Sequence, residues 1–178
     1  MRPMLCLATL LIASPVAALA AGTGSTAPTP TETTQTCTGA QVYDAETKTC
    51  VDAQESRLDD ATRIDAAREL AAFDRPRDAL DVLAHVTRKN TPEVLTLRGF
   101  ATRKAGDFDA GRALYESALA IDPDYILARS YLGQALAERG DTAAARQQLA
   151  MIRQAGGRET WAETSLADAI RTGRGYSH

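Results

Sequence analysis

Few of the residue types that build catalytic sites occur in this sequence. The 178 residues include only two histidines, His85 and His178. His85 directly precedes the predicted packing position Val86, so a surface imidazole is expected there, and His178 is expected to be frayed. No phosphate-binding glycine loop, His-Glu-x-x-His helix or Gly-x-Ser-x-Gly turn is present. We therefore predict that the protein is not an enzyme and uses no cofactor.

Neither sign of charge is in large excess. The 20 Lys and Arg residues stand against 23 Asp and Glu residues, a net charge of −3. This balance argues against a nucleic-acid-binding surface and against a polybasic membrane patch. With 44% hydrophobic and 24% charged residues, the chain has the composition of a globular protein, which excludes collagen and wholesale disorder.

The first twenty residues predict a signal peptide. They carry one positive charge, then an apolar run, then the small-x-small site Ala18-Leu19-Ala20. Cleavage after Ala20 would remove Arg2 and leave 19 basic against 23 acidic residues, a net charge of −4. The alternative is an uncleaved anchor, but the run from Met4 to Ile12 is short for a membrane span and Ser14-Pro15 interrupts it. We expect an exported, periplasmic protein without an integral span after cleavage.

Cysteine is also scarce. Cys6 lies within the predicted signal peptide, which leaves Cys37 and Cys50. An even pair in an oxidising compartment predicts a disulfide. A zinc site is poorly supported, because two thiols without a nearby histidine or a second cysteine pair leave the ion two ligands short.

Two segments of unlike composition precede the rest of the chain. Residues 21–36 have no large apolar side chain and predict a flexible Thr-rich leader. Residues 37–56 predict a hairpin-like loop closed by the disulfide, which we interpret as a stapled cap or spacer. Its Gly, Val-Tyr and Lys-x-Cys-Val pattern loosely resembles the second half of small chitin-binding cysteine modules. The alternative function is therefore binding of cell-wall glycan through this loop, with the following helices as a spacer.

From Arg57 onward, apolar residues recur at spacings of three and four, which predicts helices. The sequence then repeats with a period of 34, the length of a helix-turn-helix unit. Three pairs of identical residues carry the repeat: Gly99 and Gly133, Gly106 and Gly140, Asp107 and Asp141.

Each repeated residue has a predicted structural role. Gly106 and Gly140 are expected to turn left-handed where one helix ends, and the following aspartates are expected to cap the next helix. Gly99 and Gly133 lie inside helices, where glycine costs about 1 kcal/mol relative to alanine. Close approach of a neighbouring helix would compensate that cost.

These residues resemble the tetratricopeptide repeat family. The unit at 126–159 supplies Leu132-Gly133, Leu136, Gly140, Ala145 and Leu149, and the unit at 92–125 supplies Leu95, Gly99, Gly106, Tyr115, Ala118 and Asp122-Pro123. The unit at 92–125 departs from the family pattern by having Arg98 in place of Leu and Gly111 in place of Ala. The resemblance implies an all-α helix-turn-helix repeat array over residues 57–172, with about three units and a C-terminal capping helix, followed by a tail at 173–178.

The resemblance also implies a function and a site. Family members bind a protein or peptide ligand on the concave face, so we expect an adaptor or assembly factor; whether it also forms a homo-oligomer is left open. Carried over by register, the ligand-contact positions are Ala61, Ile64, Arg68, Ala71 and Ala72, then Glu93, Thr96, Phe100, Arg103 and Lys104, then Leu127, Ser130, Gln134, Ala137 and Glu138.

Our hypothesis for this site is an apolar anchor edged by positive charge. Phe100 would be the anchor, Arg103 and Lys104 would attract an acidic group on the peptide, and Arg68 and Gln134 would flank them. The alternative is that Phe100 packs inside the array and the basic pair is a solvated face.

Overall fold

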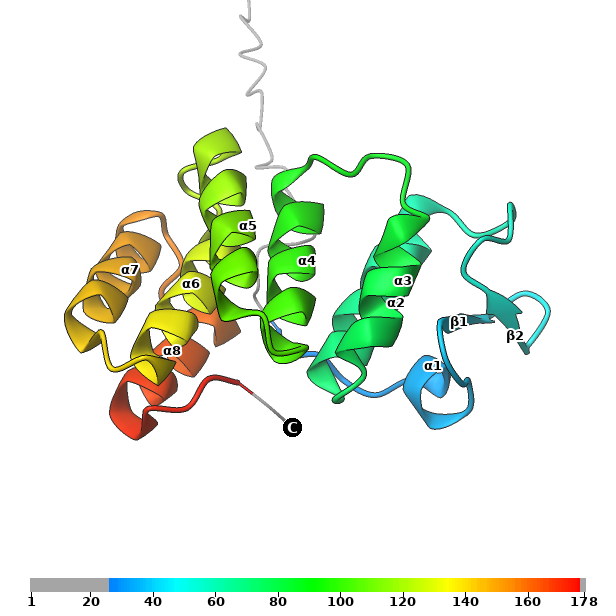
Figure 1. The fold of residues 1–178 in the computed structure, drawn as a ribbon, viewed down its shortest axis with the longest axis horizontal. Helices are drawn as coiled ribbons and strands as arrows, with labels where there is room; N and C mark the ends of the chain where they lie inside the picture. Colours follow the sequence, from blue (N-terminus) through cyan, green and yellow to red (C-terminus); the bar gives the residue numbers. More distant parts are fainter. Residues whose placement is uncertain (1–25, 177–178) are drawn as a thin grey trace, which may run out of the picture.

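Helix pairs stack side by side in this protein, whose computed structural model describes residues 26–176. The predicted signal peptide, residues 1–20, lies outside the described residues. The described chain forms α1 (Glu32–Gln35), β1 (Gln41–Asp44), β2 (Thr49–Asp52), α2 (Asp60–Ala72), α3 (Pro76–Ala84), α4 (Pro92–Lys104), α5 (Phe108–Ile121), α6 (Ile126–Glu138), α7 (Thr142–Gln154) and α8 (Trp161–Thr172) (Figure 1). The pairs α2/α3, α4/α5 and α6/α7 are the three predicted units, and α8 packs on α6 and α7 as the capping helix. The predicted helical repeat array is confirmed.

The turns inside the units end one helix and start the next. Gly106 has a φ of 108°, which places it in the left-handed region where a side chain is disfavoured. The carboxylate of Asp107 then accepts a hydrogen bond from the amide of Ala110 at 3.0 Å and caps α5. Gly140, with a φ of 81°, and Asp141 repeat the arrangement before α7. The repeated Gly-Asp pair therefore marks the same turn in two successive units.

Two glycines let α4 and α5 touch through their backbones. A Cβ atom added to Gly99 would lie 2.9 Å from the carbonyl oxygen of Gly111 and 2.7 Å from the ring of Tyr115. A Cβ atom added to Gly111 would lie 2.8 Å from the carbonyl oxygen of Gly99. Gly111, where the family pattern has Ala, thus belongs to this close approach.

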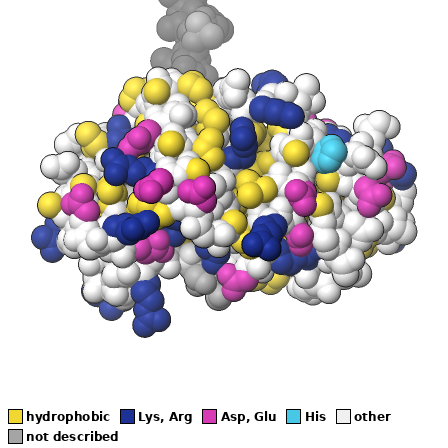
Figure 2. All heavy atoms as spheres, in the orientation of Figure 1, with side chains coloured by type: hydrophobic (Ala, Val, Ile, Leu, Met, Phe, Trp, Pro, Cys, Tyr) yellow, Lys and Arg dark blue, Asp and Glu magenta, His cyan; other side chains and the backbone are white. Residues whose placement is uncertain are grey.

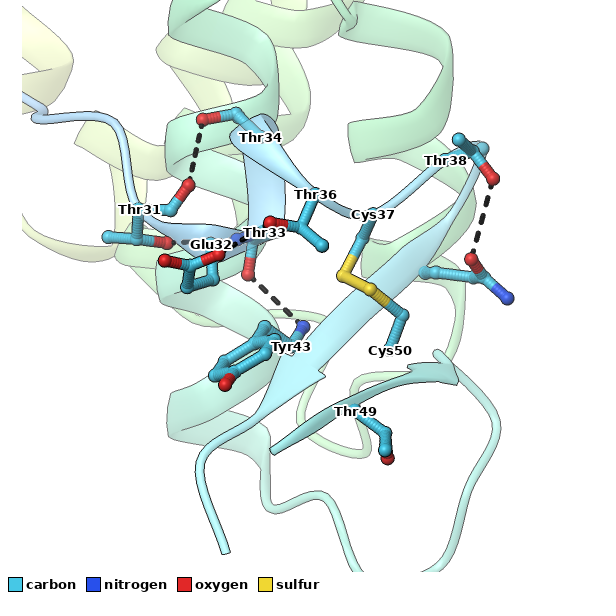
Figure 3. The surroundings of a disulfide bond; sticks show 12 residues. Thr31, Glu32, Thr33, Thr34, Thr36, Cys37, Thr38, Tyr43, Thr49 and Cys50 are labelled. Carbon is cyan, nitrogen blue, oxygen red and sulfur yellow. Dashed lines mark hydrogen bonds between the residues drawn. A yellow bond between two sulfur atoms is a disulfide. The ribbon is translucent and has the colours of Figure 1, made fainter. Parts of the chain in front are cut away.

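The disulfide loop forms a hairpin at the N-terminal end of the array. Strands β1 and β2 are antiparallel, with Val42 opposite Val51, and Cys37 is bonded to Cys50 (Figure 3). Val42 is almost fully buried and belongs to the same core as the helices. The hairpin therefore continues the packed structure beyond α2 and α3.

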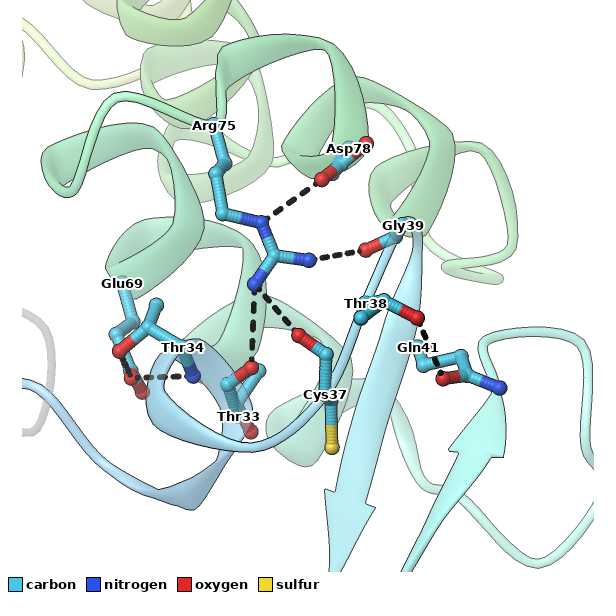
Figure 4. A network of polar contacts seen from close by, with 9 residues as sticks. All are labelled: Thr33, Thr34, Cys37, Thr38, Gly39, Gln41, Glu69, Arg75 and Asp78. Atoms are coloured by element: carbon cyan, nitrogen blue, oxygen red, sulfur yellow. Dashed lines mark hydrogen bonds and ion pairs between the residues drawn. The ribbon is translucent and has the colours of Figure 1, made fainter.

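Arg75, in the turn between α2 and α3, holds the hairpin segment by its backbone. Its guanidinium donates to the carbonyl oxygens of Cys37 at 2.9 Å, Gly39 at 2.6 Å and Thr33 at 3.3 Å, and it pairs with Asp78 (Figure 4). Because a planar guanidinium bonded to three carbonyl groups holds them at set angles, Arg75 fixes the orientation of the hairpin segment as well as its distance from the helices.

The folded chain begins earlier than its composition predicts. Residues 31–36, assigned to the flexible leader, include helix α1. The buried carboxylate of Glu69 on α2 accepts hydrogen bonds from the Thr31 amide at 2.6 Å and the Thr34 amide at 3.1 Å. Threonine groups bonded to a buried carboxylate order this segment although it has no large apolar side chain.

Positive and negative side chains are interspersed on the face shown in Figure 2, with hydrophobic atoms in small groups between them. Within residues 26–176, the large hydrophobic side chains of Ile121 and Met151 are exposed. No helix within that stretch is both long enough and apolar enough to cross a bilayer.

Gly99→Ala should lower the free energy of unfolding by about 1 to 3 kcal/mol, because the new methyl group must push α4 away from α5. Urea denaturation followed by circular dichroism measures this change. Helix propensity alone predicts the opposite sign, a gain of about 1 kcal/mol. A stabilised variant would therefore contradict the close approach.

Candidate peptide-binding groove

The first helices of the units are enclosed, whereas the second helices lie outside. Most residues of α4 and α6 are buried, but α5 buries only Gly111, Tyr115 and Ala118, and α7 buries only Ala145 and Ile152. We call α2, α4, α6 and α8 the inner helices. A ligand-binding site on the family's concave face would be built from their side chains.

Aromatic rings connect the inner helices from unit to unit. Phe100 on α4 stacks on Tyr131 on α6 with ring centroids 4.4 Å apart, and Tyr131 meets Trp161 of α8 edge-on at 6.1 Å. Trp161 in turn meets Tyr176 edge-on at 4.8 Å. We call these four rings the aromatic column. Phe100 and Tyr131 have no exposed surface, so the predicted apolar anchor Phe100 is an internal packing residue. This agrees with the first part of the alternative stated above. The second part, a solvated basic pair, differs from the structure, in which the side chains of Arg103 and Lys104 are 6% and 13% exposed.

The basic pair predicted beside Phe100 is already neutralised by the chain itself. The guanidinium of Arg103, whose side chain is 6% exposed, lies 2.6 Å from the carboxylate of Glu138. The ammonium of Lys104 lies 2.7 Å from the carboxylate of Asp74. The hypothesis that these two cations attract an acidic peptide is not supported by this geometry, because both charges link neighbouring units instead.

Gln134, the flanking residue on α6, is fully buried and binds the C-terminal segment. Its amide nitrogen donates to Ser130 and Ser165, and its amide oxygen accepts from the backbone nitrogen of Tyr176 at 2.7 Å. The backbone nitrogen of Gly175 donates to Glu138 at 3.0 Å. Residues 175 and 176 thus lie against two of the ligand-contact positions assigned by register.

Arg68 is the predicted site residue that remains at an open part of the inner face. It helps line a cavity of about 250 Å³, together with Asp60, Ala61, Ile64, Asp65, Arg88, Glu93, Leu97 and Leu127. A second cavity of about 270 Å³ shares Asp60, Ile64, Arg88 and Glu93 and extends to Val86, Thr91, Pro92, Asp122 and Tyr125. We call the two cavities together the inner groove.

Register identified part of this lining and missed the rest. Ala61, Ile64, Arg68, Glu93 and Leu127 line the inner groove and are all positions assigned from the family. Asp60 and Asp65 were missed. Asp65 lies three residues before Arg68 on α2, and residues three apart are neighbours on a helix surface, so this spacing could have placed Asp65 beside Arg68. Arg88 and Tyr125 lie outside the inner helices, so positions counted along those helices could not include them.

The lining of the inner groove carries more acid than base. Asp60, Asp65, Glu93 and Asp122 stand against Arg68 and Arg88. Burial raises the pKa of Glu93, and the neighbouring charge of Asp65 raises it further. Burial also raises the pKa of Asp65, while Arg68 opposes this effect. An acidic ligand would therefore meet repulsion here.

Within the described part of the chain, no three His, Cys, Asp or Glu residues come together in a way that could hold a metal ion. The acidic groups of the inner groove are spread over α2, α4 and the segment before α6 rather than gathered at one point. What this arrangement can do is contact a ligand along its length with apolar and charged side chains.

Comparison with known proteins gives one family. Residues 103–163, from the end of α4 to the start of α8, match the family model described as Tetratricopeptide repeat. A comparison with curated proteins finds no match.

The raised pKa of Glu93 predicts a pH dependence. A carboxyl group whose pKa is raised by folding adds stability below its ordinary value of 4.5, and this stability is lost as the pH rises through the raised value. The free energy of unfolding of the wild type, minus that of Glu93→Gln, should therefore be larger near pH 4.5 than near neutral pH. Urea denaturation of both proteins at the two pH values tests this, and a difference that does not change with pH would contradict it.

Proposed function

We propose, from the premise that the helical array belongs to the tetratricopeptide repeat family, that this protein is a non-catalytic adaptor or assembly factor of the bacterial cell envelope. Repeats of this family mediate contacts between proteins, and fold alone does not identify a partner. The observation that carries the proposal is the inner groove, because family ligand-contact positions from three units line one cavity. Its occupant would be a segment of another protein.

The charges of the groove narrow the class of partner segment. Acidic side chains would face Asp60, Asp65 and Glu93, and the two cations predicted to receive them are paired elsewhere. We therefore propose an uncharged or basic segment rather than an acidic one. Like charges brought together at an interface oppose binding, which makes the acidic lining a means of rejecting wrong partners.

The proposed location rests on the predicted signal peptide and on the disulfide. Disulfides persist in oxidising compartments such as the bacterial periplasm and are rare in the cytosol. The bond between Cys37 and Cys50 closes the hairpin that Arg75 holds against α2 and α3. Binding of cell-wall glycan through this loop stays a prediction from the sequence.

A charge exchange inside the groove tests the proposal. Asp65 and Arg88 both line the groove and both reach solvent, so Asp65→Arg/Arg88→Glu changes the groove charges and preserves net charge. A matched control is Arg112→Glu/Glu116→Arg, which exchanges an exposed ion pair on the outer helix α5. We expect affinity capture from a native envelope extract to yield a protein with the wild type and the control, and at least about tenfold less of it with the groove variant, a change of about 1.4 kcal/mol.

Circular dichroism and urea denaturation must show that both variants keep their helices. Equal capture by all three proteins would place binding outside the inner groove. Equal loss in both variants would trace the effect to surface charge in general and would also reject this site.

A further inference from the structure

The chain turns back beside α8 after that helix ends. Gly173, with a φ of 70°, ends α8 in the left-handed region, so the next residues leave the helix axis. Two backbone hydrogen bonds, from Gly175 and Tyr176, then fasten the segment to α6. A Cβ atom on Gly175 would collide with the carboxylate of Glu138, so glycine lets the segment approach this closely. Residues 174–176 are therefore held as a wall beside α8.

A cavity of about 570 Å³ lies between this wall and α8. Small-molecule sites have volumes of about 300 to 1,000 Å³, so this one can hold a small ligand. Its lining shares no residue with the inner groove. In Figure 1, α8 lies at the opposite end of the array from β1 and β2. We call this space the α8 cavity.

Two aromatic rings form one corner of the α8 cavity. Trp161, at the start of α8, and Tyr176 meet edge-on, with centroids 4.8 Å apart and ring planes at 85°. The buried ring of Tyr131 supports Trp161, edge-on at 6.1 Å. Both rings of the corner are partly exposed, so they offer a ligand an apolar surface. The corner is fixed before a ligand arrives, which lowers the entropy that binding costs.

Hydrogen-bond acceptors predominate among the non-aromatic side chains of the cavity. The hydroxyls of Thr164 and Thr172 donate to backbone carbonyl oxygens of the preceding turn, at 3.0 and 2.8 Å. Their own oxygen atoms are left as acceptors. The carboxylate of Asp168 is the strongest acceptor, because its ion pair with Arg171 is exposed to solvent and therefore weak. The guanidinium of Arg174 balances the charge of Asp168.

This lining favours a ligand that is uncharged and rich in hydrogen-bond donors. One carboxylate and one guanidinium leave the cavity without a net charge that would attract an anion or a cation. A pyranose ring has C–H groups on its faces, which pack on aromatic rings, and hydroxyl groups around its edge, which donate to acceptors. A saccharide therefore matches both the aromatic corner and the excess of acceptors.

We propose that the α8 cavity binds a neutral saccharide. Trp161 and Tyr176 pack on the face of a sugar ring, and the two oxygens of Asp168 accept from its hydroxyl groups. Burial of the C–H face supplies affinity, and the hydrogen bonds fix the orientation of the ring. This site goes beyond the proposed adaptor function and uses none of the residues of the inner groove. It is also separate from the disulfide loop, for which the sequence predicts glycan binding.

Nuclear magnetic resonance of the full chain tests the proposal. The sole tryptophan of the sequence lines the cavity, so the protein has one indole N–H resonance and this resonance reports on the site. The probes are three neutral disaccharides: maltose, cellobiose and N,N′-diacetylchitobiose. We expect a disaccharide of this set to shift the indole resonance until the site is saturated.

Two single substitutions separate the cavity from the ion pair beside it. Asp168→Ala and Arg171→Ala both remove that pair, but only Asp168 lines the cavity. The two side chains are 70% and 72% exposed, so neither change disturbs the core. We expect the dissociation constant to rise at least about tenfold in Asp168→Ala, through loss of a charge-assisted hydrogen bond, and to stay within about twofold in Arg171→Ala.

Four results would overturn the proposal. The first is an indole resonance that none of the three disaccharides shifts. The second is equal affinity in the wild type and both variants, or equal weakening in both, because Asp168 would then not be the acceptor. Shifts in the amides of β1 and β2 with an unmoved indole resonance would place the saccharide at the disulfide loop. Tighter binding of tetramethylammonium would make the corner a site for organic cations. None of these results changes the outcome of envelope capture, which tests the inner groove.

Discussion

The stacking of Phe100 on Tyr131 is the contact on which the arrangement of the inner face depends. It joins the inner helices of the second and third units at a ring separation of 4.4 Å, and both rings are fully buried. Aromatic pairs of this kind add about 0.5 to 1.5 kcal/mol beyond the area they bury. Because the column continues through Trp161 to Tyr176, the C-terminal half of the inner face is filled by the protein itself. Towards α2 the inner face has open space, the inner groove.

The two ends of the array are closed by different means. At the C-terminal end, α8 covers α6 and α7 in the way that a terminal helix closes a repeat array. At the N-terminal end, a disulfide-closed hairpin takes this role, held by Arg75 and Glu69 through backbone groups and threonines. This attachment adds polar contacts to an apolar one, because Val42, Ala53 and Leu58 are buried in the same core as α2 and α3. The carboxylate of Glu69 is buried and accepts several hydrogen bonds, as a buried charge requires.

Local residues predicted the array well, and long-range contacts explain what they could not predict. The Gly-Asp pairs at 106 and 140 encode their turns directly, since a left-handed residue and a capping carboxylate act on adjacent backbone. The partner of Arg103 is 35 residues away and that of Lys104 is 30 residues away, so no local pattern shows that their charges are cancelled. The burial of Phe100 likewise depends on Tyr131 in the next unit. Composition identified residues 31–36 as polar, but their order depends on Glu69, a residue on another element.

The position of Trp161 has a practical consequence. It is the sole tryptophan of the sequence, and its ring lies between Tyr131 in the core and Tyr176 in the C-terminal segment. The indole is therefore an intrinsic fluorophore whose surroundings change when the last residues leave the inner face. Loss of the Tyr176 ring would admit water to one side of the indole and move its emission to longer wavelength. The protein thus carries its own optical signal for the state of its C-terminus, without any attached dye.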